Sequence, residues 1–240
     1  MKRIFSSVLF FVAFFVYGQN VNDFTFTINE NGVSITLTGY KGNERNLVIP
    51  EQINGIPVIS IGWQWYVDSN ISSVFIPKTI TSISSSVFTQ WFSLLEINVD
   101  EGNPVYYSSA GILFGKDNSI VRYPSQKRET SYVVPSGITK IGDNAFSHNH
   151  ILLTVTLPSG LKEIGEYAFY GSNIESIIFP DSLEKIGMYT FYECSKLKIQ
   201  SIPNQIKEIG YGAFYGCDSI STTIRERIES IGDSAFSAGV

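Results

Sequence analysis

Cysteine and histidine are the residues of this sequence best suited to nucleophilic or metal chemistry, and the chain has two of each. Cys194 and Cys217 lie 23 residues apart, and each comes three residues after a phenylalanine. Such a pair can be two buried thiols, a disulfide formed in an oxidising compartment, or part of a metal site. Further ligands are missing nearby, so we expect buried thiols first and a disulfide second.

His148 and His150 lie in the short segment S-H-N-H. Two histidines do not complete a structural metal site, so we expect solvated loop residues. The sequence has no G-x-S-x-G, phosphate-binding loop or H-E-x-x-H motif, and two histidines give little scope for a catalytic relay. A carboxylate pair acting on a glycosidic bond is the enzymatic alternative that remains. We expect no enzyme, no catalytic residue, no metal and no cofactor.

Tyrosine is the better candidate for function, because it offers rigid contact area with a polar tip. A tyrosine directly follows a phenylalanine at Tyr170, Tyr192 and Tyr215. Another precedes a phenylalanine by two residues at Tyr167 and Tyr189. If these segments stack, the tyrosines form columns that either bind a partner or simply brace neighbouring segments.

A second candidate patch contains the aromatic residues Trp63, Trp91 and Phe92. They lie in less regular parts of the N-terminal half. Either a binding surface or structural packing accounts for them.

The tyrosines recur because the sequence itself repeats. The phrase I-G-x-x-A-F, or a close variant, returns at steps of 22 or 23 residues from Ile141 to Ile231, with degenerate copies at Ile61 and Ile83. In most copies a proline stands six residues before the isoleucine. The phenylalanines of the five clear copies, expected to form a repeated core, are Phe146, Phe169, Phe191, Phe214 and Phe236.

Each repeat predicts one coil of a stack. Apolar residues alternate before the proline, as at Val155 and Leu157, which is typical of a short strand facing a core. After the proline they come at spacing three, as at Leu161 and Ile164, which suits a chain turning around a coil. We expect the proline to end the strand, the glycine to permit a bend, and the phenylalanine rings to stack.

Charged residues at equivalent positions alternate in sign along the repeats. If the coils stack at a parallel-strand spacing of about 4.8 Å, each charge faces opposite charges on both neighbours. Such pairs fix the register of the stack. The first row is Lys140, Glu163, Lys185 and Glu208, and the second row is Lys162, Glu184, Lys207 and Glu229.

The N-terminus predicts an exported protein. A basic pair, a 13-residue apolar run from Ile4 to Val16 and the small Gly18 are typical of a signal peptide over residues 1–18. The apolar run is short for a membrane span, and no later segment is apolar enough for one. The formal charge of the full chain is −5, and loss of Lys2 and Arg3 makes it more negative. An acidic surface argues against nucleic acid as a partner.

Three regions follow the leader. Residues 19–46 do not repeat, and alternating strands around N-E-N-G predict a β-hairpin cap. Residues 47–240 form the repeat array. Within it, residues 98–130 are inserted or form an irregular pair of coils, and the last copy ends soon after Phe236.

Residues 47–240 resemble the BspA-type leucine-rich repeat family of bacterial surface proteins, which carry the same L-x-x-I-x-I-P, central I-G and A-F pattern. The resemblance implies a right-handed, curved solenoid with short parallel β-strands, mainly β and irregular coil. It also implies a secreted or cell-surface protein that adheres to a protein, such as a host extracellular-matrix protein, or to a glycan. The alternative is a structural component of the cell envelope that assembles through its repeat edge.

Overall fold

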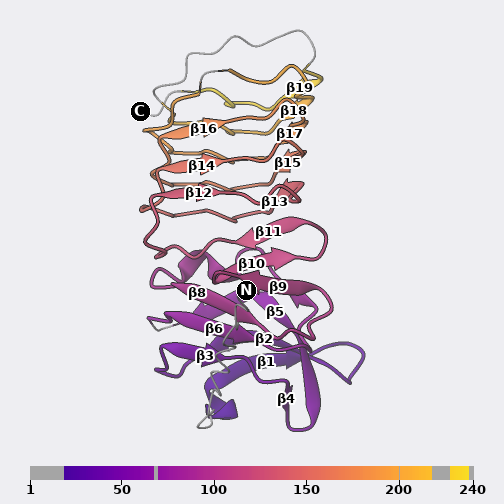
Figure 1. The fold of residues 1–240 in the computed structure, drawn as a ribbon. Coiled ribbons are helices and arrows are strands. Elements are labelled where there is room, and N and C mark those ends of the chain that lie inside the picture. Colours follow the sequence, from indigo (N-terminus) through magenta and orange to yellow (C-terminus); the bar gives the residue numbers. More distant parts are fainter. Residues whose placement is uncertain (1–18, 68–69, 200, 218–227, 238–240) are drawn as a thin grey trace, which may run out of the picture.

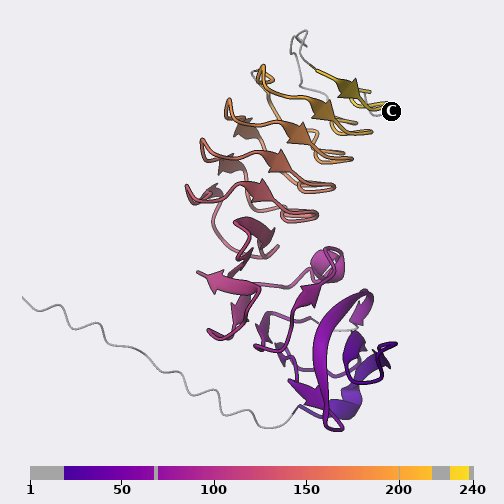
Figure 2. The same ribbon diagram turned by 90° about the vertical axis from the view of Figure 1, so that its right-hand side faces the viewer.

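The computed structural model shows an elongated stack of coils, with an irregular N-terminal part and a regular C-terminal part (Figures 1 and 2). It describes residues 19–67, 70–199, 201–217 and 228–237, with the backbone alone for residues 63–67. The predicted signal peptide lies outside the described residues. Helix in the described part is limited to two short 3-10 segments, Val21–Asp23 (η1) and Val87–Gln90 (η2).

The N-terminal part begins with a β-hairpin where the sequence predicts one. Its strands β1 (Phe24–Ile28) and β2 (Ile35–Tyr40) pair antiparallel across a turn in which Gly32 has a φ of 69°. That left-handed conformation favours glycine. β2 also pairs in parallel with β5, so the hairpin continues into the stack.

Two sheets build the rest of the N-terminal part. In the first, β5 (Ile56–Val67) pairs in parallel with β7 (Ser82–Ile83) and antiparallel with β4 (Gln52–Ile53). The second contains the parallel strands β3 (Asn46–Val48), β6 (Ser73–Ile76) and β8 (Glu96–Val99).

The irregular region of residues 98–130 forms an antiparallel meander that is joined to the stack. Its strands are β9 (Tyr106–Ser109), β10 (Ile112–Gly115) and β11 (Ser119–Arg122). β11 pairs in parallel with β13, and this register sets Ile120 opposite Ile141. The meander therefore ends in a strand that takes the place of the repeat strand before the first regular coil.

The meander also separates two hydrophobic cores. Side chains of β10 alternate, so Leu113 belongs to the N-terminal core, while Ile112 and Phe114 belong to the C-terminal core. At the end of β11, the buried Arg122 guanidinium donates to the carbonyl oxygen of Asn144 at 2.6 Å and to Ser147 Oγ at 2.9 Å. Arg122 thus provides donors to the first regular coil.

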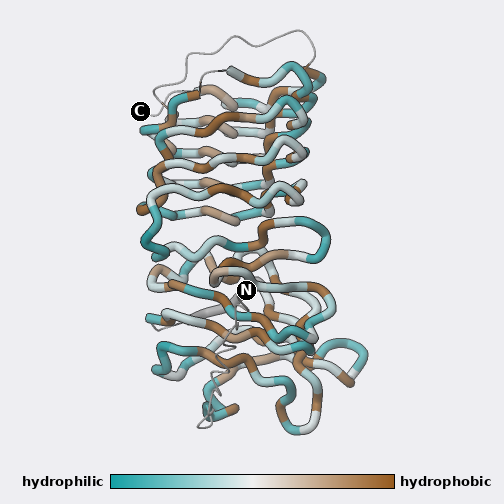
Figure 3. Tube along the Cα trace, viewed as in Figure 1, coloured by the Kyte–Doolittle hydropathy of each residue, from teal (hydrophilic) through white to brown (hydrophobic). Residues whose placement is uncertain are grey.

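The regular coils form the strand that the sequence predicts before the proline, in a parallel sheet of three strands, and a second, unpredicted strand at the central isoleucine. Hydrophobic residues recur at the same places in successive coils (Figure 3). One sheet contains β12 (Ser131–Val133), β14 (Thr154–Thr156) and β16 (Ser176–Ile178). The other contains β13 (Lys140–Ile141), β15 (Glu163–Ile164), β17 (Lys185–Ile186), β18 (Glu208–Ile209) and β19 (Ser230–Ile231).

A column of aromatic rings runs through the C-terminal core. Successive repeat phenylalanines stack with centroids 4.8–5.3 Å apart and planes within 15° of parallel. Tyr123 extends the column at one end, 5.2 Å from Phe146. Phe236 is partly buried at the other end, and the fully buried members are Phe146, Phe169, Phe191 and Phe214.

The repeat glycine occupies a position where a Cβ is hindered. Its backbone in the regular coils does not adopt a positive φ, so a left-handed conformation is not the reason. A Cβ on Gly187 would instead lie 2.7 Å from the backbone nitrogen of Glu166 in the preceding coil. Its N–H donates to the carbonyl oxygen of Ile164 at 2.8 Å. Glycine is required because the neighbouring backbone occupies the space of a side chain.

The first charge row lies in the register that its alternating signs predict. Parallel pairing sets Glu163 between Lys140 and Lys185, and Lys185 between Glu163 and Glu208. Nζ–carboxylate distances are 3.3 Å for Lys140 to Glu163 and 3.1 Å for Lys185 to Glu208. Exposed pairs of this kind contribute only about 0.2–1 kcal/mol each. Their main effect is to disfavour a slipped register.

In the second row, Glu184 accepts hydrogen bonds from lysines of both neighbouring coils. Lys162 donates to Glu184 Oε1 at 2.8 Å, and Lys207 donates to Oε2 at 2.7 Å. These hydrogen bonds, aided by the lysine charges, lower the pKa of Glu184 to about 2. Glu184 therefore joins three successive coils while it is ionised.

Replacing Phe169 by alanine should lower the free energy of unfolding by about 3–5 kcal/mol, because the variant loses a buried ring and leaves a cavity between two others. Phe191→Ala should behave alike. The control is Phe92→Ala, whose side chain is 54% exposed and whose change should stay within about 0.5 kcal/mol. Denaturant unfolding measures both. An unchanged midpoint for Phe169→Ala would show that the ring column does not hold the core.

Reversing Lys185 to glutamate places three negative charges in a row and should destabilise the fold by on the order of 1 kcal/mol. Lys196→Glu is the control, since Lys196 is exposed and makes no ion pair among the described residues. Denaturant midpoints should differ between the two variants at low salt and converge at about 1 M salt, where charges are screened. Equal midpoints at low salt would contradict the register role.

The lowered pKa of Glu184 makes its contribution to stability depend on pH. That contribution is complete above the unfolded-state pKa of about 4.3 and is lost as the pH falls through the folded-state pKa. NMR titration of the Glu184 carboxyl should give a midpoint of about 2. In a Lys162→Gln, Lys207→Gln variant the midpoint should rise toward about 4.3. Identical midpoints in the two proteins would argue against the paired hydrogen bonds.

A tyrosine-lined groove as candidate binding site

The candidate site forms at the turns that follow β15, β17 and β18 in successive regular coils. Backbone N–H groups of these turns donate to carbonyl oxygens of the next coil, as from Tyr167 to Met188 at 2.9 Å and from Phe169 to Thr190 at 2.8 Å. These bonds hold successive turns in register. Equivalent side chains therefore lie one above the other and form columns.

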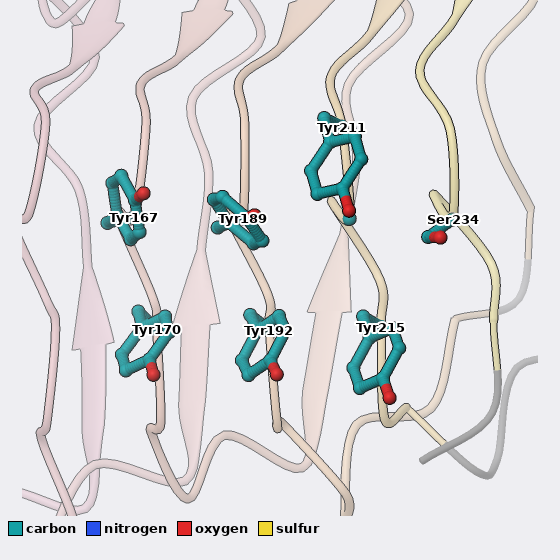
Figure 4. A pocket seen from close by; sticks show the side chains of 8 residues that line it. Tyr167, Tyr170, Tyr189, Tyr192, Tyr211, Tyr215 and Ser234 are labelled. Carbon is teal, nitrogen blue, oxygen red and sulfur yellow. The ribbon is translucent and has the colours of Figure 1, made fainter.

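One column contains the tyrosines that directly follow the core phenylalanines. Tyr170 and Tyr192 have centroids 5.2 Å apart with planes at 8°, and Tyr192 and Tyr215 are 4.9 Å apart at 7° (Figure 4). The rings are half-buried because neighbouring rings cover their faces. This column presents ring edges and hydroxyl groups to the solvent.

The second column contains Tyr167, Tyr189 and Tyr211. Tyr167 and Tyr189 have centroids 5.1 Å apart at 27°, and Tyr211 meets Tyr189 at 5.2 Å and 73°. The columns also touch each other, with Tyr189 and Tyr192 at 5.4 Å and 73°. Tyr211 is 42% exposed and is the most accessible of these rings.

An open groove of about 440 Å³ lies over the two columns. The structure brings all five sequence-predicted tyrosines to this one place. The residues that line the groove are Tyr167, Tyr170, Tyr189, Tyr192, Tyr211, Gly212, Tyr215 and Ser234 (Figure 4).

Sequence reasoning missed Tyr211, Gly212 and Ser234. Tyr211 lies three residues before Phe214, whereas Tyr189 lies two residues before Phe191. A search for tyrosines at the same repeat position therefore did not select Tyr211. Gly212 stands at the in-phase position, where a Cβ would lie 2.9 Å from the Tyr189 ring. The available signal was the dipeptide Tyr211-Gly212. A glycine at the in-phase position has no side chain, so the tyrosine before it can contribute its ring to the groove.

Tyr167 and Tyr189 occupy a backbone position that favours glycine. Their φ angles are 55° and 51°, and Gly212 adopts 57° at the equivalent position. A left-handed backbone costs a residue with a side chain about 1–3 kcal/mol. Asn144 and Ser234 adopt 59° and 57° at the equivalent positions of other coils, so the turn imposes this conformation whichever residue stands there.

The phenol groups of Tyr167, Tyr189 and Tyr192 are neutral at physiological pH. Partial burial raises the pKa of Tyr167, Tyr189 and Tyr192 above the usual value of 10. Neighbouring carboxylates add to this effect, with Glu166 acting on Tyr167 and Glu193 on Tyr192. The groove therefore offers hydroxyl groups that both donate and accept hydrogen bonds.

Of the second aromatic patch predicted from the sequence, Trp91 does not lie at the surface. Trp91 is 1% exposed and packs edge-on against Phe88 at 5.1 Å. The expectation that Trp91 presents a binding surface is wrong, because its indole fills the N-terminal core. Trp63 belongs to β5, and its side chain lies outside the described residues. Phe92 is exposed, with its ring 6.2 Å from that of His148.

Both cysteines are buried in the C-terminal core. Cys194 Sγ donates to the carbonyl oxygen of Phe169 at 3.0 Å, and Cys217 Sγ donates to that of Phe191 at 3.0 Å. Burial raises the pKa of Cys194 to about 11. A protonated, enclosed thiol is a poor nucleophile, so the pair serves packing between coils.

The two histidines lie beside the tyrosine column. The ring of His148 meets that of Tyr170 edge-on at 5.3 Å, and His150 lies 6.5 Å from His148. Burial, together with the charges of Arg122 and His150, lowers the pKa of His148, so the side chain is neutral at pH 7. The part of the chain that the structure describes holds no group of three His, Cys, Asp or Glu side chains placed to bind a metal ion.

The described residues include no helix that is long and apolar enough to span a membrane. Among curated proteins, none matches the sequence significantly. Among solved structures, the chain is similar to a leucine rich cell surface protein of Faecalibacterium prausnitzii, with a TM-score of 0.64 and 18% identity over 91% of each chain.

Two further structures share the fold. Over 80% of this chain, a leucine-rich repeat protein of Eubacterium ventriosum gives a TM-score of 0.59 at 21% identity. Over 77% of this chain, the pneumococcal vaccine antigen PcpA gives a TM-score of 0.63 at 27% identity. The similar regions span 64% and 51% of those proteins.

The repeat pattern itself identifies the family. The sequence profile of the BspA type leucine rich repeat region matches residues 17–110 and 123–239, in six copies. These matches cover most of the chain, including every regular coil. The protein belongs to the BspA-type leucine-rich repeat family.

Proposed function

We propose that this chain is a secreted or surface-attached bacterial protein that binds another protein through the tyrosine groove, without catalysis. The predicted signal peptide at residues 1–18 supports export. The observation that carries the proposal is the convergence of six tyrosines from three successive coils on one open groove. Such a surface exceeds what the stacking of three coils requires.

The chemistry of the groove suits a protein partner. Tyrosine and methionine are enriched in protein interfaces. Met188 is 41% exposed at the repeat position that Tyr211 occupies in the next coil, so it widens the apolar surface beside the groove. The tyrosines are held rigidly by stacking, so their ordering on binding costs little conformational entropy.

Membership of the family supports a host extracellular-matrix protein, such as fibronectin or fibrinogen, as the partner. Glycan binding and a structural role in the cell envelope, through assembly at the repeat edge, are the competing functions. Each gives a different result in a binding experiment with purified protein.

The tyrosine groove is tested by replacing Tyr170, Tyr192 and Tyr215 together with serine. Aromatic anchors at a hot spot contribute about 2 kcal/mol or more each, so loss of two productive contacts should weaken binding about a thousandfold. Surface plasmon resonance on immobilised fibronectin and fibrinogen measures the affinity. Circular dichroism of the same variant measures its fold and melting temperature.

The single variant Tyr211→Ser is the matched control for folding, because this ring is the most exposed of the six. It should weaken binding about tenfold or more and change the melting temperature little. Wild-type affinity in both variants would exclude the groove. Failure of the wild-type chain to bind either matrix protein, with concentration-dependent self-association, would favour the envelope role.

A further inference from the structure

The groove lies in a surface that carries only negative formal charge. The turn that forms it runs from three residues before each core phenylalanine to two residues after. In the regular coils, the described residues of this turn include no lysine or arginine. Its charged residues are Asp143, Glu166, Glu193 and Asp233.

Two of these carboxylates are next in sequence to tyrosines that line the groove. Glu166 directly precedes Tyr167 in one column, and Glu193 directly follows Tyr192 in the other. Both side chains are exposed, and neither makes an ion pair among the described residues. Each lies close enough to its neighbouring tyrosine to raise the pKa of the phenol.

Nearby cations are already engaged elsewhere. Lys185 is paired with Glu208 at 3.1 Å in the charge row. Arg122 is buried and donates to the first regular coil. His148 has a lowered pKa and carries no charge at pH 7. The hydrogen bond to Glu208 raises the pKa of Lys185, and the charge of Glu166 adds to this effect, but the ion pair of Lys185 is with Glu208. The described residues of the turn itself supply no lysine or arginine to the groove.

The aromatic surface adds to this preference for a cation. Lysine and arginine are attracted to the faces of aromatic rings, most strongly where water is partly excluded. The two columns meet at 54° between Tyr167 and Tyr170, and at 73° between Tyr189 and Tyr192. Tyr211 departs from the stack, at 73° to Tyr189, and is 42% exposed, so it is the ring most accessible to a cation.

The dimensions of the groove suit an extended chain. From Tyr167 to Ser234 it crosses three steps between coils, or about 14 Å at the spacing of parallel strands. An extended peptide covers that distance with about four residues. Alternate side chains of such a segment point to the same side and meet the rings.

We infer that the groove accepts an extended segment of a partner protein that carries lysine or arginine side chains. This inference rests on the proposed protein-binding function and names the chemistry of the partner. The cationic groups lie against the tyrosine rings, and Glu166 and Glu193 neutralise them. Tyrosine hydroxyls bond to the backbone of the bound segment.

Isothermal titration calorimetry of the full chain with synthetic peptides tests the inference. The probe is an acetylated and amidated eight-residue peptide of alternating lysine and serine, and the matched peptides carry glutamine or glutamate in place of lysine. Only the lysine peptide should bind. Its affinity should fall about tenfold or more between about 0.05 M and 0.5 M salt, because the attraction is screened.

The variant Glu166→Gln, Glu193→Gln should weaken binding of the lysine peptide about tenfold or more, which corresponds to about 1.4 kcal/mol. The control variant Glu30→Gln, Glu101→Gln loses the same net charge at exposed sites in the N-terminal half and should keep wild-type affinity. Tyr211→Ser should also weaken binding. Together these results separate a local site from a general effect of net charge.

Equal loss in the two charge variants would overturn the inference, because it would assign binding to net charge alone. Binding of the glutamine peptide as tightly as the lysine peptide would overturn it as well. Absence of peptide binding, with matrix-protein binding that still depends on Tyr211, would reject the basic segment and leave the groove as the site. Binding of uncharged oligosaccharides such as cellohexaose instead of the lysine peptide would reject a protein partner.

Discussion

Close stacking of successive coils is the constraint on which the rest of this structure depends. The repeat glycine makes it possible, because the backbone of the adjacent coil occupies the place of a Cβ at Gly187. The spacing that results brings the centroids of successive phenylalanine rings to 4.8–5.3 Å, the range of offset stacking. A side chain at the glycine position would separate the coils and disrupt both the backbone hydrogen bonds and the ring column.

The same spacing turns every repeated surface residue into a column. At one position the column alternates lysine with glutamate and stabilises the register through pairs such as Lys185 and Glu208. On the tyrosine turns, aromatic rings stack instead, and carboxylates flank them without basic neighbours in the described part of the turn. A repeat protein can therefore make an extended, chemically uniform surface from a small change in one repeat position. Such a binding surface can be lengthened or shortened only by whole coils.

The regular array needs a start that differs from the repeat. Tyr123 covers the first phenylalanine of the ring column, and Arg122 donates to the carbonyl oxygen of Asn144. Both residues end the antiparallel meander that separates the two cores. The strand that carries Ile120 therefore connects an irregular N-terminal part to the coils while preserving their spacing. This strand lacks the I-G-x-x-A-F phrase. Arg122 and Tyr123 make the contacts with the first regular coil instead.

The sequence by itself determined the coil length, the ring column and the charge register, because each depends on periodic residues whose neighbours lie one repeat away. It also brought five tyrosines into phase. Tertiary structure alone decided what the irregular segments do. Trp91 comes three residues after Phe88, at the position of cysteine in two later coils, and only the fold shows that the core there accommodates its larger indole. Tyr211 is out of phase, and it joins the groove because Gly212 leaves space beside Tyr189. The sequence suggested that the repeat glycine permits a bend. Only the structure shows that the backbone of the preceding coil occupies the position of its Cβ.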